Sequence, residues 1–256
     1  MVPAMNEPKS ILITGASSGL GAALARAYAA PGVKLTLGGR DAERLGRIAA
    51  ECRARGAEVV AAAVDVTDAE ATARWIAAAD EANPLDLVIA NAGISGGTFG
   101  GGESQEQAAA IVATNLGGVI HTVHPAAERM RARRRGQIAI MSSLAGFRGM
   151  PGAPAYGASK AASRSYGEAL RGTLHRHNVG VTVICPGFIR TPMTDVNGFR
   201  MPMLMEADRA ARLIRRGLAR NRARIAFPFR LYALVWLLGA LPPSWTDPVF
   251  RRMPEK

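Results

Sequence analysis

The sequence has little cysteine, few acidic residues and no long apolar run, and each shortage narrows what the protein can be. Its two cysteines, Cys52 and Cys185, lie far apart without metal-ligand spacing. This argues against zinc and against a disulfide framework, and it favours a reducing compartment. The initial segment MVPAMNEPKS has no apolar core long enough for a signal peptide. We therefore expect a cytoplasmic location, with the inner membrane surface as the alternative.

Acidic residues are outnumbered, since 20 Asp and Glu face 32 Lys and Arg, for a net charge of +12. Such a balance is typical of proteins that bind nucleic acid, anionic lipid or phosphorylated ligands. No zinc-finger spacing or RNA-binding aromatic signature accompanies the charge, so nucleic-acid binding is a minor alternative. One arginine run falls where a helix should end, which favours an interaction with the helix dipole over a binding patch. It comprises Arg129, Arg131, Arg133, Arg134 and Arg135.

Length and patterning favour one α/β domain over residues 1–256. With 48% hydrophobic residues the chain can bury a full core. Short apolar runs recur, each followed by an alanine-rich helical stretch, and this alternation predicts a doubly wound parallel sheet with strands buried on both faces. The runs are SILITG, VKLTLGG, EVVAAAVDV, LDLVIANAG, GQIAIMSS and VGVTVICPG. Ligands bind such sheets beyond the carboxyl ends of the strands.

The first strand run ends in the glycine-rich turn TGASSGLG, residues 14–21, which leads into the helical stretch AALARAYAA. Gly15, Gly19 and Gly21 let the turn tighten, let backbone N–H groups approach a pyrophosphate and let the helix pack closely on the sheet. A glycine-rich turn alone is weak evidence, but its place between strand and helix predicts a dinucleotide site.

A second motif, SSLAGFRGMPGAPAYGASK, spans residues 142–160. Tyr156 and Lys160 are four residues apart, which places both side chains on one face of a helix. A cation beside a phenol favours the phenolate and lowers the phenol pKa toward the neutral range. The pair therefore suits proton transfer, although the same spacing also occurs in surface helices.

These motifs together resemble the short-chain dehydrogenases/reductases. The resemblance extends to about residue 195, through VDVTD (64–68), NAG (91–93), Asn115, Ser143 thirteen residues before Tyr156, and Pro186-Gly187 with Thr191. It implies a Rossmann-type fold with a mostly parallel seven-stranded sheet, a nicotinamide cofactor, alcohol–carbonyl oxidoreduction, and a homodimer or homotetramer. No metal is implied.

The resemblance assigns catalytic roles to Asn115, Ser143, Tyr156 and Lys160. Tyr156 would be the acid/base, and Ser143, chosen over its neighbour Ser142 by spacing, would orient the substrate oxygen. Lys160 would lower the Tyr156 pKa and bind the nicotinamide ribose, while Asn115 would hold a water that links Lys160 to solvent. Tyr166 is expected to be structural, as are His121 and His124.

The resemblance also assigns a set of cofactor-binding residues. The set is Gly15, Ser17, Ser18, Gly19, Leu20, Gly21, Arg40, Asp65, Val66, Asn91, Ala92, Gly93, Tyr156, Lys160, Pro186, Gly187, Ile189 and Thr191. Gly39 and Arg40 end the second strand run, where NAD-dependent relatives carry an acid. Since a guanidinium can bind a 2′-phosphate and an acid would repel it, NADP(H) is favoured over NAD(H). Asp41 is expected to be a helix N-cap.

Residues 188–205 correspond to the family's mobile substrate lid. Here the segment is rich in methionine and apolar, which favours a small lipophilic carbonyl or alcohol substrate, although packing against the core or a second subunit would explain it equally well. Residues 206–256 form a basic and apolar C-terminal extension of the same domain. Its arginines precede LYALVWLLGALPPSW, which is too short to span a bilayer but suits either peripheral membrane contact or a helix buried at a subunit interface or over the pocket.

The leading hypothesis is thus an NADP(H)-dependent oxidoreductase. The alternative is a non-catalytic NADP(H)-binding protein that serves regulation or membrane interaction, but such a protein has no need of a proton relay. Enoyl reduction is a further alternative within the enzyme class, although relatives with that activity space Tyr and Lys more widely.

Overall fold

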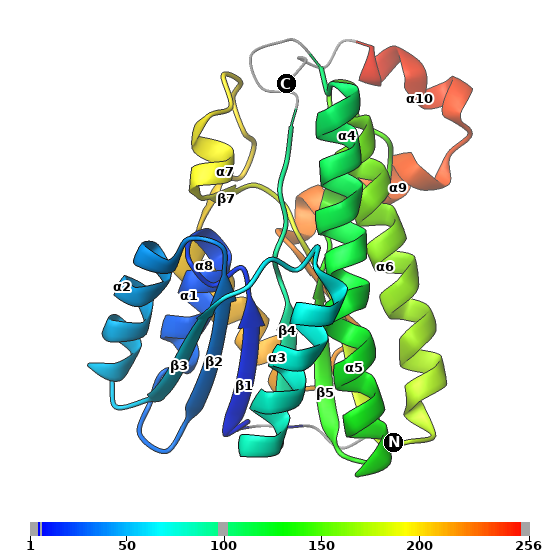
Figure 1. The fold of residues 1–256 in the computed structure, drawn as a ribbon. Coiled ribbons are helices and arrows are strands. Elements are labelled where there is room, and N and C mark those ends of the chain that lie inside the picture. Colours follow the sequence, from blue (N-terminus) through cyan, green and yellow to red (C-terminus); the bar gives the residue numbers. More distant parts are fainter. Residues whose placement is uncertain (1–4, 6, 97–101, 252–256) are drawn as a thin grey trace.

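Seven strands form one sheet in the computed structural model, which describes residues 5, 7–96 and 102–251 (Figure 1). Their order is β3-β2-β1-β4-β5-β6-β9, and every pairing is parallel. The strands are β1 (Ser10–Thr14), β2 (Lys34–Gly39), β3 (Glu58–Ala63), β4 (Leu87–Ala90), β5 (Gly136–Met141), β6 (Val179–Pro186) and β9 (Arg224–Phe227). The expected Rossmann-type sheet is confirmed, and it is parallel throughout.

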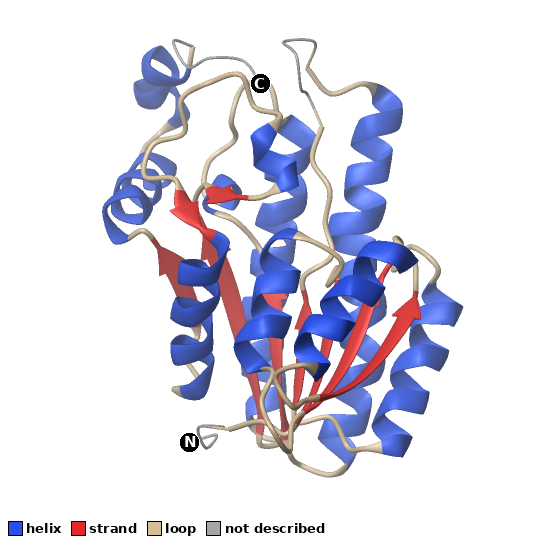
Figure 2. Cartoon of the chain, turned by 90° about the vertical axis from the view of Figure 1, so that its left-hand side faces the viewer, coloured by secondary structure: helices blue, strands red, loops and turns tan. Residues whose placement is uncertain are grey.

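Helices cover both faces of the sheet, so the strands lie between two cores (Figure 2). Helices α1 (Gly19–Tyr28), α2 (Ala42–Arg53) and α8 (Ala207–Ala219) line one core, and α3 (Ala69–Ala82), α5 (Gly118–Ala132) and α6 (Pro154–His175) line the other. Side chains alternate along a strand, so Ile11 and Ile13 enter the first core while Leu12 enters the second. Helix α4 (Gln105–Val112) leads into α5 through a π-helical turn, Ala113–Gly117.

All six predicted strand runs form strands, but one differs in burial and one strand was not predicted. We expected the run EVVAAAVDV to be buried on both faces, and this was wrong: β3 is an edge strand, and Val60 is 65% exposed. The unpredicted strand is β9, whose four residues pair with β6 at the opposite edge. Arginines before β9 mask its short apolar pattern in the sequence.

The predicted C-terminal extension, residues 206–256, contains two different parts, and residues 252–256 lie outside the described range. Its first part belongs to the layered fold: α8 buries Ile214 and Leu218 against α1, and β9 completes the sheet. Its second part is α9 (Phe229–Ala240) and α10 (Pro243–Phe250), which lie beyond the sheet edge (Figure 1). Among the described residues, no helix combines the length and the apolarity that crossing a membrane requires.

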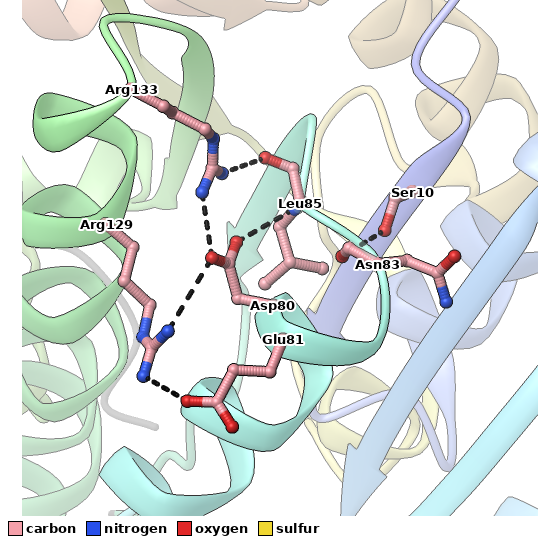
Figure 3. A network of polar contacts seen from close by, with 7 residues as sticks. All are labelled: Ser10, Asp80, Glu81, Asn83, Leu85, Arg129 and Arg133. Carbon is pink, nitrogen blue, oxygen red and sulfur yellow. Dashed lines mark hydrogen bonds and ion pairs between the residues drawn. The ribbon is translucent and has the colours of Figure 1, made fainter.

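The arginine run at the end of α5 makes ion pairs with the last turn of α3 and a hydrogen bond with the α3–β4 loop (Figure 3). Arg133 donates to Asp80 at 2.8 Å and to the Leu85 carbonyl, while Arg129 donates to Glu81 at 2.9 Å. Asp80 is buried and also accepts from the Leu85 backbone N–H. These cations therefore fasten the base of the sheet, in agreement with their predicted place at a helix end.

The chain reverses direction across the sheet between β1 and β4. From β1 it proceeds outward to β2 and β3, and then it crosses back to β4 and continues to β5, β6 and β9. Loops that leave neighbouring strands on opposite sides open a crevice at such a switch point. The carboxyl ends of β1 and β4 are therefore where a ligand should bind.

Candidate active site

The glycine-rich turn after β1 has no room for larger side chains. Gly15 and Gly19 have φ values of +65° and +53°, which disfavour residues with a Cβ. A Cβ at Gly15 would lie 2.8 Å from the Ala92 Cα, and one at Gly21 would lie 2.2 Å from the Gly15 carbonyl oxygen. Within the described chain, Ser18 begins α1 without a side-chain capping bond. The N–H groups of the first turn are thus available to an anion.

Thr14 and Asn91 fasten this turn to the end of β4. The Thr14 hydroxyl accepts hydrogen bonds from the backbone N–H groups of Asn91 (3.0 Å) and Ala92 (3.1 Å). The Asn91 amide donates to the carbonyls of Thr14 (3.0 Å) and Gly15 (3.2 Å). The two strand ends at the switch point therefore form one rigid unit. Sequence reasoning identified Asn91 but missed Thr14, the first residue of the TGASSGLG motif.

At the end of β2, Asp41 begins α2 as its N-cap and accepts from the Arg44 backbone N–H at 2.8 Å, which confirms the predicted cap. Its second oxygen accepts from the Arg44 guanidinium at 2.6 Å. These bonds to Arg44 lower the pKa of the Asp41 carboxyl. Arg40 is exposed, and both Arg40 and Arg44 line the pocket that opens at the carboxyl ends of the strands. Sequence reasoning named Arg40 but missed Arg44, whose position one turn into α2 could have indicated it.

At the end of β3, Asp65 accepts from the Thr67 backbone N–H and hydroxyl, both at 2.9 Å. The bond from the Thr67 backbone is the main cause that lowers the Asp65 pKa, and nearby Arg40 adds to it. Val66 is buried, and its carbonyl oxygen lies 2.8 Å from Nδ1 of His121. His121 thus holds the Val66 backbone in place, a contact that the sequence did not reveal.

Ser143, Tyr156 and Lys160 come together where β5 leads into α6. Ser143 follows β5 and makes a side-chain hydrogen bond with Tyr156. Lys160 is 4% exposed, and its ammonium lies 5.7 Å from the Tyr156 ring centroid and donates to the Met141 carbonyl at 3.1 Å. Ser142 instead donates to the Lys160 backbone carbonyl at 2.7 Å. The two serines thus differ in task, since Ser143 contacts the phenol and Ser142 holds the α6 backbone.

Burial dominates the electrostatics of this group. It raises the pKa of the Tyr156 phenol, which the hydrogen bond with Ser143 partly offsets, and it lowers the pKa of Lys160 to about 8. The identified downward influence on the Tyr156 pKa is therefore Ser143, whereas the expected influence of Lys160 stays a prediction. A lysine with a pKa of about 8 exchanges its proton readily near neutral pH.

Asn115 lies in the π-helical turn between α4 and α5 and is fully buried. Its side chain accepts from the Ile94 N–H at 2.8 Å, and it donates to the Ile94 carbonyl and to the Ser159 hydroxyl. Ser163 donates to the Asn115 carbonyl, which satisfies a backbone group of the irregular turn. A Cβ at Gly93 would lie 3.1 Å from Asn115 Oδ1 and 3.3 Å from Lys160 Nζ. Gly93 thus lets the two side chains approach each other.

The far wall of the pocket is the predicted lid, residues 188–205, which contains β7 (Ile189–Arg190), α7 (Pro192–Asp195) and the start of β8 (Met205–Glu206). Strands β7 and β8 pair with each other, and Phe188 and Phe199 are in edge-to-face contact at 5.9 Å. The Thr191 methyl group approaches the glycine turn, since a Cβ at Gly19 would lie 3.1 Å from it. The lid therefore reaches across to the β1 side of the pocket.

One pocket unites the residues predicted to bind the cofactor, because all eighteen line it, and Ser143 lines it as well. Asn115 lies behind this wall and contacts Ile94, which is itself a lining residue. Three additional lining residues, Pro192, Met193 and Thr194, belong to the predicted lid. The lining residues that the sequence did not assign to the site are Gly39, Asp41, Arg44, Val64, Ile94, Thr114, Met141 and Ser142. No group of three or more His, Cys, Asp or Glu side chains that could hold a metal occurs within the described ranges.

These residues fit a dinucleotide with a nicotinamide end. The uncapped start of α1 offers N–H groups to a pyrophosphate, and two arginines stand at one end of the pocket. The Ser143–Tyr156 pair and the buried Lys160 stand in the same pocket. Such an arrangement can hold a proton beside a bound oxygen at one place and neutralise phosphate charge at another.

Comparisons with known proteins agree with this geometry. A family model described as short chain dehydrogenase matches residues 9–198. An uncharacterized oxidoreductase of Myxococcus xanthus is 40% identical over 96% of this chain and 97% of its own length. Among solved structures, a short chain dehydrogenase/reductase from Burkholderia phymatum in complex with NAD is 27% identical with a TM-score of 0.83, covering 98% of both chains. A variant of the actinorhodin polyketide ketoreductase with NADPH is 26% identical with a TM-score of 0.76, covering 88% of this chain and 97% of that one.

Proposed function

Because this chain belongs to the short-chain dehydrogenase/reductase family, we propose that it is an NADP(H)-dependent oxidoreductase that interconverts a carbonyl and an alcohol on a lipophilic substrate. Membership in the family supports the broader activity, oxidoreduction between CH–OH and C=O groups. The observation that carries the finer proposal is the single pocket that holds the Ser143–Tyr156 pair at one place and Arg40 and Arg44 at another.

In the proposed reaction, a bound nicotinamide cofactor supplies or accepts the hydride. The Tyr156 hydroxyl donates a proton to the substrate oxygen during reduction and accepts it during oxidation. Ser143 hydrogen-bonds the same oxygen and keeps it within reach of the phenol. The Lys160 ammonium, held by the Met141 carbonyl at 3.1 Å, favours the phenolate that forms when Tyr156 gives up its proton.

Reprotonation of Tyr156 would proceed through Lys160 and a water held by Asn115. Two observations support this relay. Burial brings the Lys160 pKa to about 8, so the amine can release and regain a proton near neutral pH. In addition, Asn115 Oδ1 and Lys160 Nζ both lie next to Gly93, in the space that a Cβ at this position would enter. Asn115 is a positioning residue in this scheme, because its own bonds fix the Ile94 backbone beside the pocket.

The preference for NADP(H) rests on the residues at the end of β2. Gly39 and Arg40 replace the acid that would repel a 2′-phosphate, and Arg44 adds a second cation to the pocket wall. Asp41, the residue that follows Arg40, is occupied by the α2 N-terminus and by Arg44. The similar structures contain NAD in one case and NADPH in the other, so the argument for the phosphate depends on this chain's own arginines.

The lipophilic substrate is inferred from the lid. Met193 lines the pocket, and the Phe188–Phe199 contact and Met205 make the segment around it apolar. Methionine-rich surfaces adapt to varied apolar shapes. We further propose, by analogy with the family, that the protein works as a homodimer or homotetramer in the cytoplasm.

The proposal is tested by following NADPH consumption by the purified protein against ketones, aldehydes and quinones of increasing lipophilicity, with Tyr156→Phe in parallel. We expect turnover by the wild-type protein that rises with substrate lipophilicity and is lost in the variant. NADPH binding without consumption of any compound in either direction would instead support the non-catalytic alternative. Turnover that is equal in the wild-type protein and the variant would remove Tyr156 from the mechanism.

A further inference from the structure

The C-terminal helices α9 and α10 carry a concentrated patch of exposed apolar side chains. Ten large hydrophobic residues are exposed in the described part of the chain, and half of them fall within residues 229–245. Each of these five is more than half exposed, with Phe229 at 76% and Trp245 at 72%. We call them the apolar patch: Phe229, Leu234, Trp236, Leu237 and Trp245. An apolar surface of this kind marks an interaction site.

Helix α9 is apolar on its inner and outer faces. Its inner face buries Val235, and a Cβ at Gly239 would lie 2.4 Å from the Phe147 carbonyl oxygen, so the helix packs closely on the loop after Ser143. Its outer face carries the four patch residues that precede Trp245, and Arg230 is the one charged residue of the helix. A helix that is hydrophobic all round is normally buried. A binding partner or surface other than the rest of this chain should therefore cover the outer face of α9.

The patch is preformed, because α10 is fixed to the body of the protein. Arg148, in the loop after Ser143, donates to the Thr246 hydroxyl and to Asp247 at 3.1 Å. The Arg148 guanidinium also lies 4.8 Å from the Phe250 ring centroid. Thr246 is buried at 1% exposure. Trp245, the residue before it, is thereby held outward rather than folded onto the core.

Three further exposed apolar residues lie on the lid, beside the pocket. Met193, Val196 and Met203 are exposed on the lid, which leaves two of the ten described exposed hydrophobics, Val60 and Val112, outside these two segments. Figure 1 shows α7 of the lid and α10 at the same end of the molecule, above the carboxyl ends of the strands. The exposed apolar residues of the lid and the apolar patch therefore lie at the end of the molecule where the strands have their carboxyl ends and where the pocket is found.

We propose that α9 and α10 dock on the surface of a phospholipid bilayer and turn the pocket entrance toward the lipid. Two of the three tryptophans of the chain lie in the patch, and tryptophan favours the membrane–water interface. Neither helix is long enough to span, so the contact is interfacial. This docking does not depend on the proposed reaction, although it would deliver lipophilic substrates.

Charge favours lipid over a second copy of the chain as the occupant. Arg230 and Arg251 are exposed at the two ends of this region, and its acid, Asp247, is already paired with Arg148. In a twofold dimer the same patch meets itself, so these cations would face like charges with no free acid between them. An anionic lipid surface is complementary to the same cations.

The structure also sets the expected role of salt. The other arginines of residues 206–251 lie on α8, between α8 and β9, or at the start of β9. Arg215 lies against Tyr28, and Arg224 pairs with Glu168. With two exposed cations beside the patch among the described residues, the apolar side chains should dominate binding. We expect binding to vesicles of phosphatidylcholine and phosphatidylglycerol to weaken in high salt but to persist.

The test is cosedimentation of full-length protein with such vesicles, comparing Leu237→Gln/Trp245→Gln with the matched control Val60→Gln/Val112→Gln. All four residues are exposed, so both variants should fold, which circular dichroism and thermal unfolding verify. The patch variant should partition about 100-fold more weakly, because two large side chains no longer enter lipid. The control should bind like the wild-type protein.

Three outcomes would overturn the proposal. One is wild-type protein that stays in the supernatant with vesicles at low salt. Another is an equal loss of binding in the control variant. The third is a wild-type protein that binds no vesicles together with a patch variant whose molar mass in light scattering is half that of the wild-type protein. That result would assign the patch to a second copy of the chain. Because no substrate is needed, failure here leaves the proposed reaction intact.

Discussion

The Glu103 carboxylate accepts hydrogen bonds from the backbone N–H groups of Ala155 at 2.5 Å and of Tyr156 at 3.1 Å. Helix α6 begins at Pro154, and Ala153 at its N-cap has no side chain that could cap it. Glu103, from the loop before α4, therefore satisfies two of its first N–H groups and places a negative charge at the positive end of the helix dipole. The same contact fixes the backbone of Tyr156.

We predict that Glu103→Ala lowers kcat about tenfold while the Kd for NADPH is unchanged, because the first turn of α6 loosens and the phenol is no longer held in place. Loss of the two capping bonds should cost about 1–2 kcal/mol and lower Tm by a few degrees. Glu103→Gln, which keeps an acceptor oxygen, should recover part of kcat.

The control for Glu103 is Glu106→Ala. Glu106 is an exposed acid in the first turn of α4 that hydrogen-bonds Ser104. It should change neither kcat nor NADPH affinity. A Glu103→Ala variant that loses Tm but keeps full kcat would limit Glu103 to a structural role.

A second prediction asks whether Tyr156 and Lys160 act as one device. Tyr156→Phe removes the transferable proton and the bond with Ser143, so turnover should fall about 100-fold or more while NADPH binding survives. Lys160→Ala should lose turnover and also bind NADPH more weakly. Because both residues serve one proton transfer, the double variant should lose far less than the product of the single losses in steady-state kinetics. Multiplicative losses would show that the two residues act independently.

The order of strand runs and motifs predicted the fold, and the residues predicted to form the site line one pocket, because a parallel sheet brings the ends of its strands to one edge. The turn at Gly15, the residues after β3 and the end of β5 are distant in sequence, yet adjacent strands place them in one pocket. Strand pairing thus turns a list of motifs into a site without any information on side-chain contacts.

The features that the sequence could not reveal depend on contacts between distant residues or on irregular backbone. Glu103 precedes Tyr156 by more than fifty positions in a loop with no motif, and the π-helical turn that carries Asn115 has no periodic signature. Exposure was equally hidden: β3 reads as a buried strand because apolar runs do not reveal which strand forms the edge of the sheet.

A third prediction concerns pH. Burial lowers the Lys160 pKa from 10.5 to about 8, so the unfolded chain binds more protons than the folded protein between these values. The stability contribution of Lys160 therefore rises with pH across this window, and its destabilising effect is fully present below pH 8. Lys160→Met should be more stable than the wild-type protein at pH 7, by about 3 kcal/mol as an upper estimate.

Urea unfolding of both proteins at several pH values between 7 and 9.5 measures this difference. The excess stability of Lys160→Met should shrink as pH rises. Titration of the buried Cys52 thiol affects both proteins and cancels in the difference, whereas Cys185 interacts electrostatically with Lys160 and raises the Lys160 pKa. The raised pKa values of Tyr28 and Tyr156 keep both phenols protonated in the folded protein over this range. A difference that does not vary with pH would mean that Lys160 titrates normally.

The last prediction separates the two arginines at the end of β2. Arg40→Asp should weaken NADPH binding and narrow or reverse the preference over NADH, because it replaces a phosphate partner with a repelling charge. Arg44→Ala should weaken the binding of NADPH but not that of NADH. The loss should lie in the roughly 10-fold to 100-fold range expected for one charge-assisted hydrogen bond. Its effect should be the smaller one, since Asp41 already engages the Arg44 guanidinium at 2.6 Å.

Arg47→Ala is the matched control for these arginine variants, since Arg47 also lies on α2, is 63% exposed and pairs with Glu43. Fluorescence titration with both cofactors should show it binding like the wild-type protein. If Arg40→Asp leaves the ratio of the two affinities unchanged while Arg44→Ala alters it, Arg44 is the principal phosphate partner and Arg40 a bystander. If neither variant alters the ratio, the end of β2 does not select the cofactor, because no charge next to a 2′-phosphate can change sign without affecting its binding.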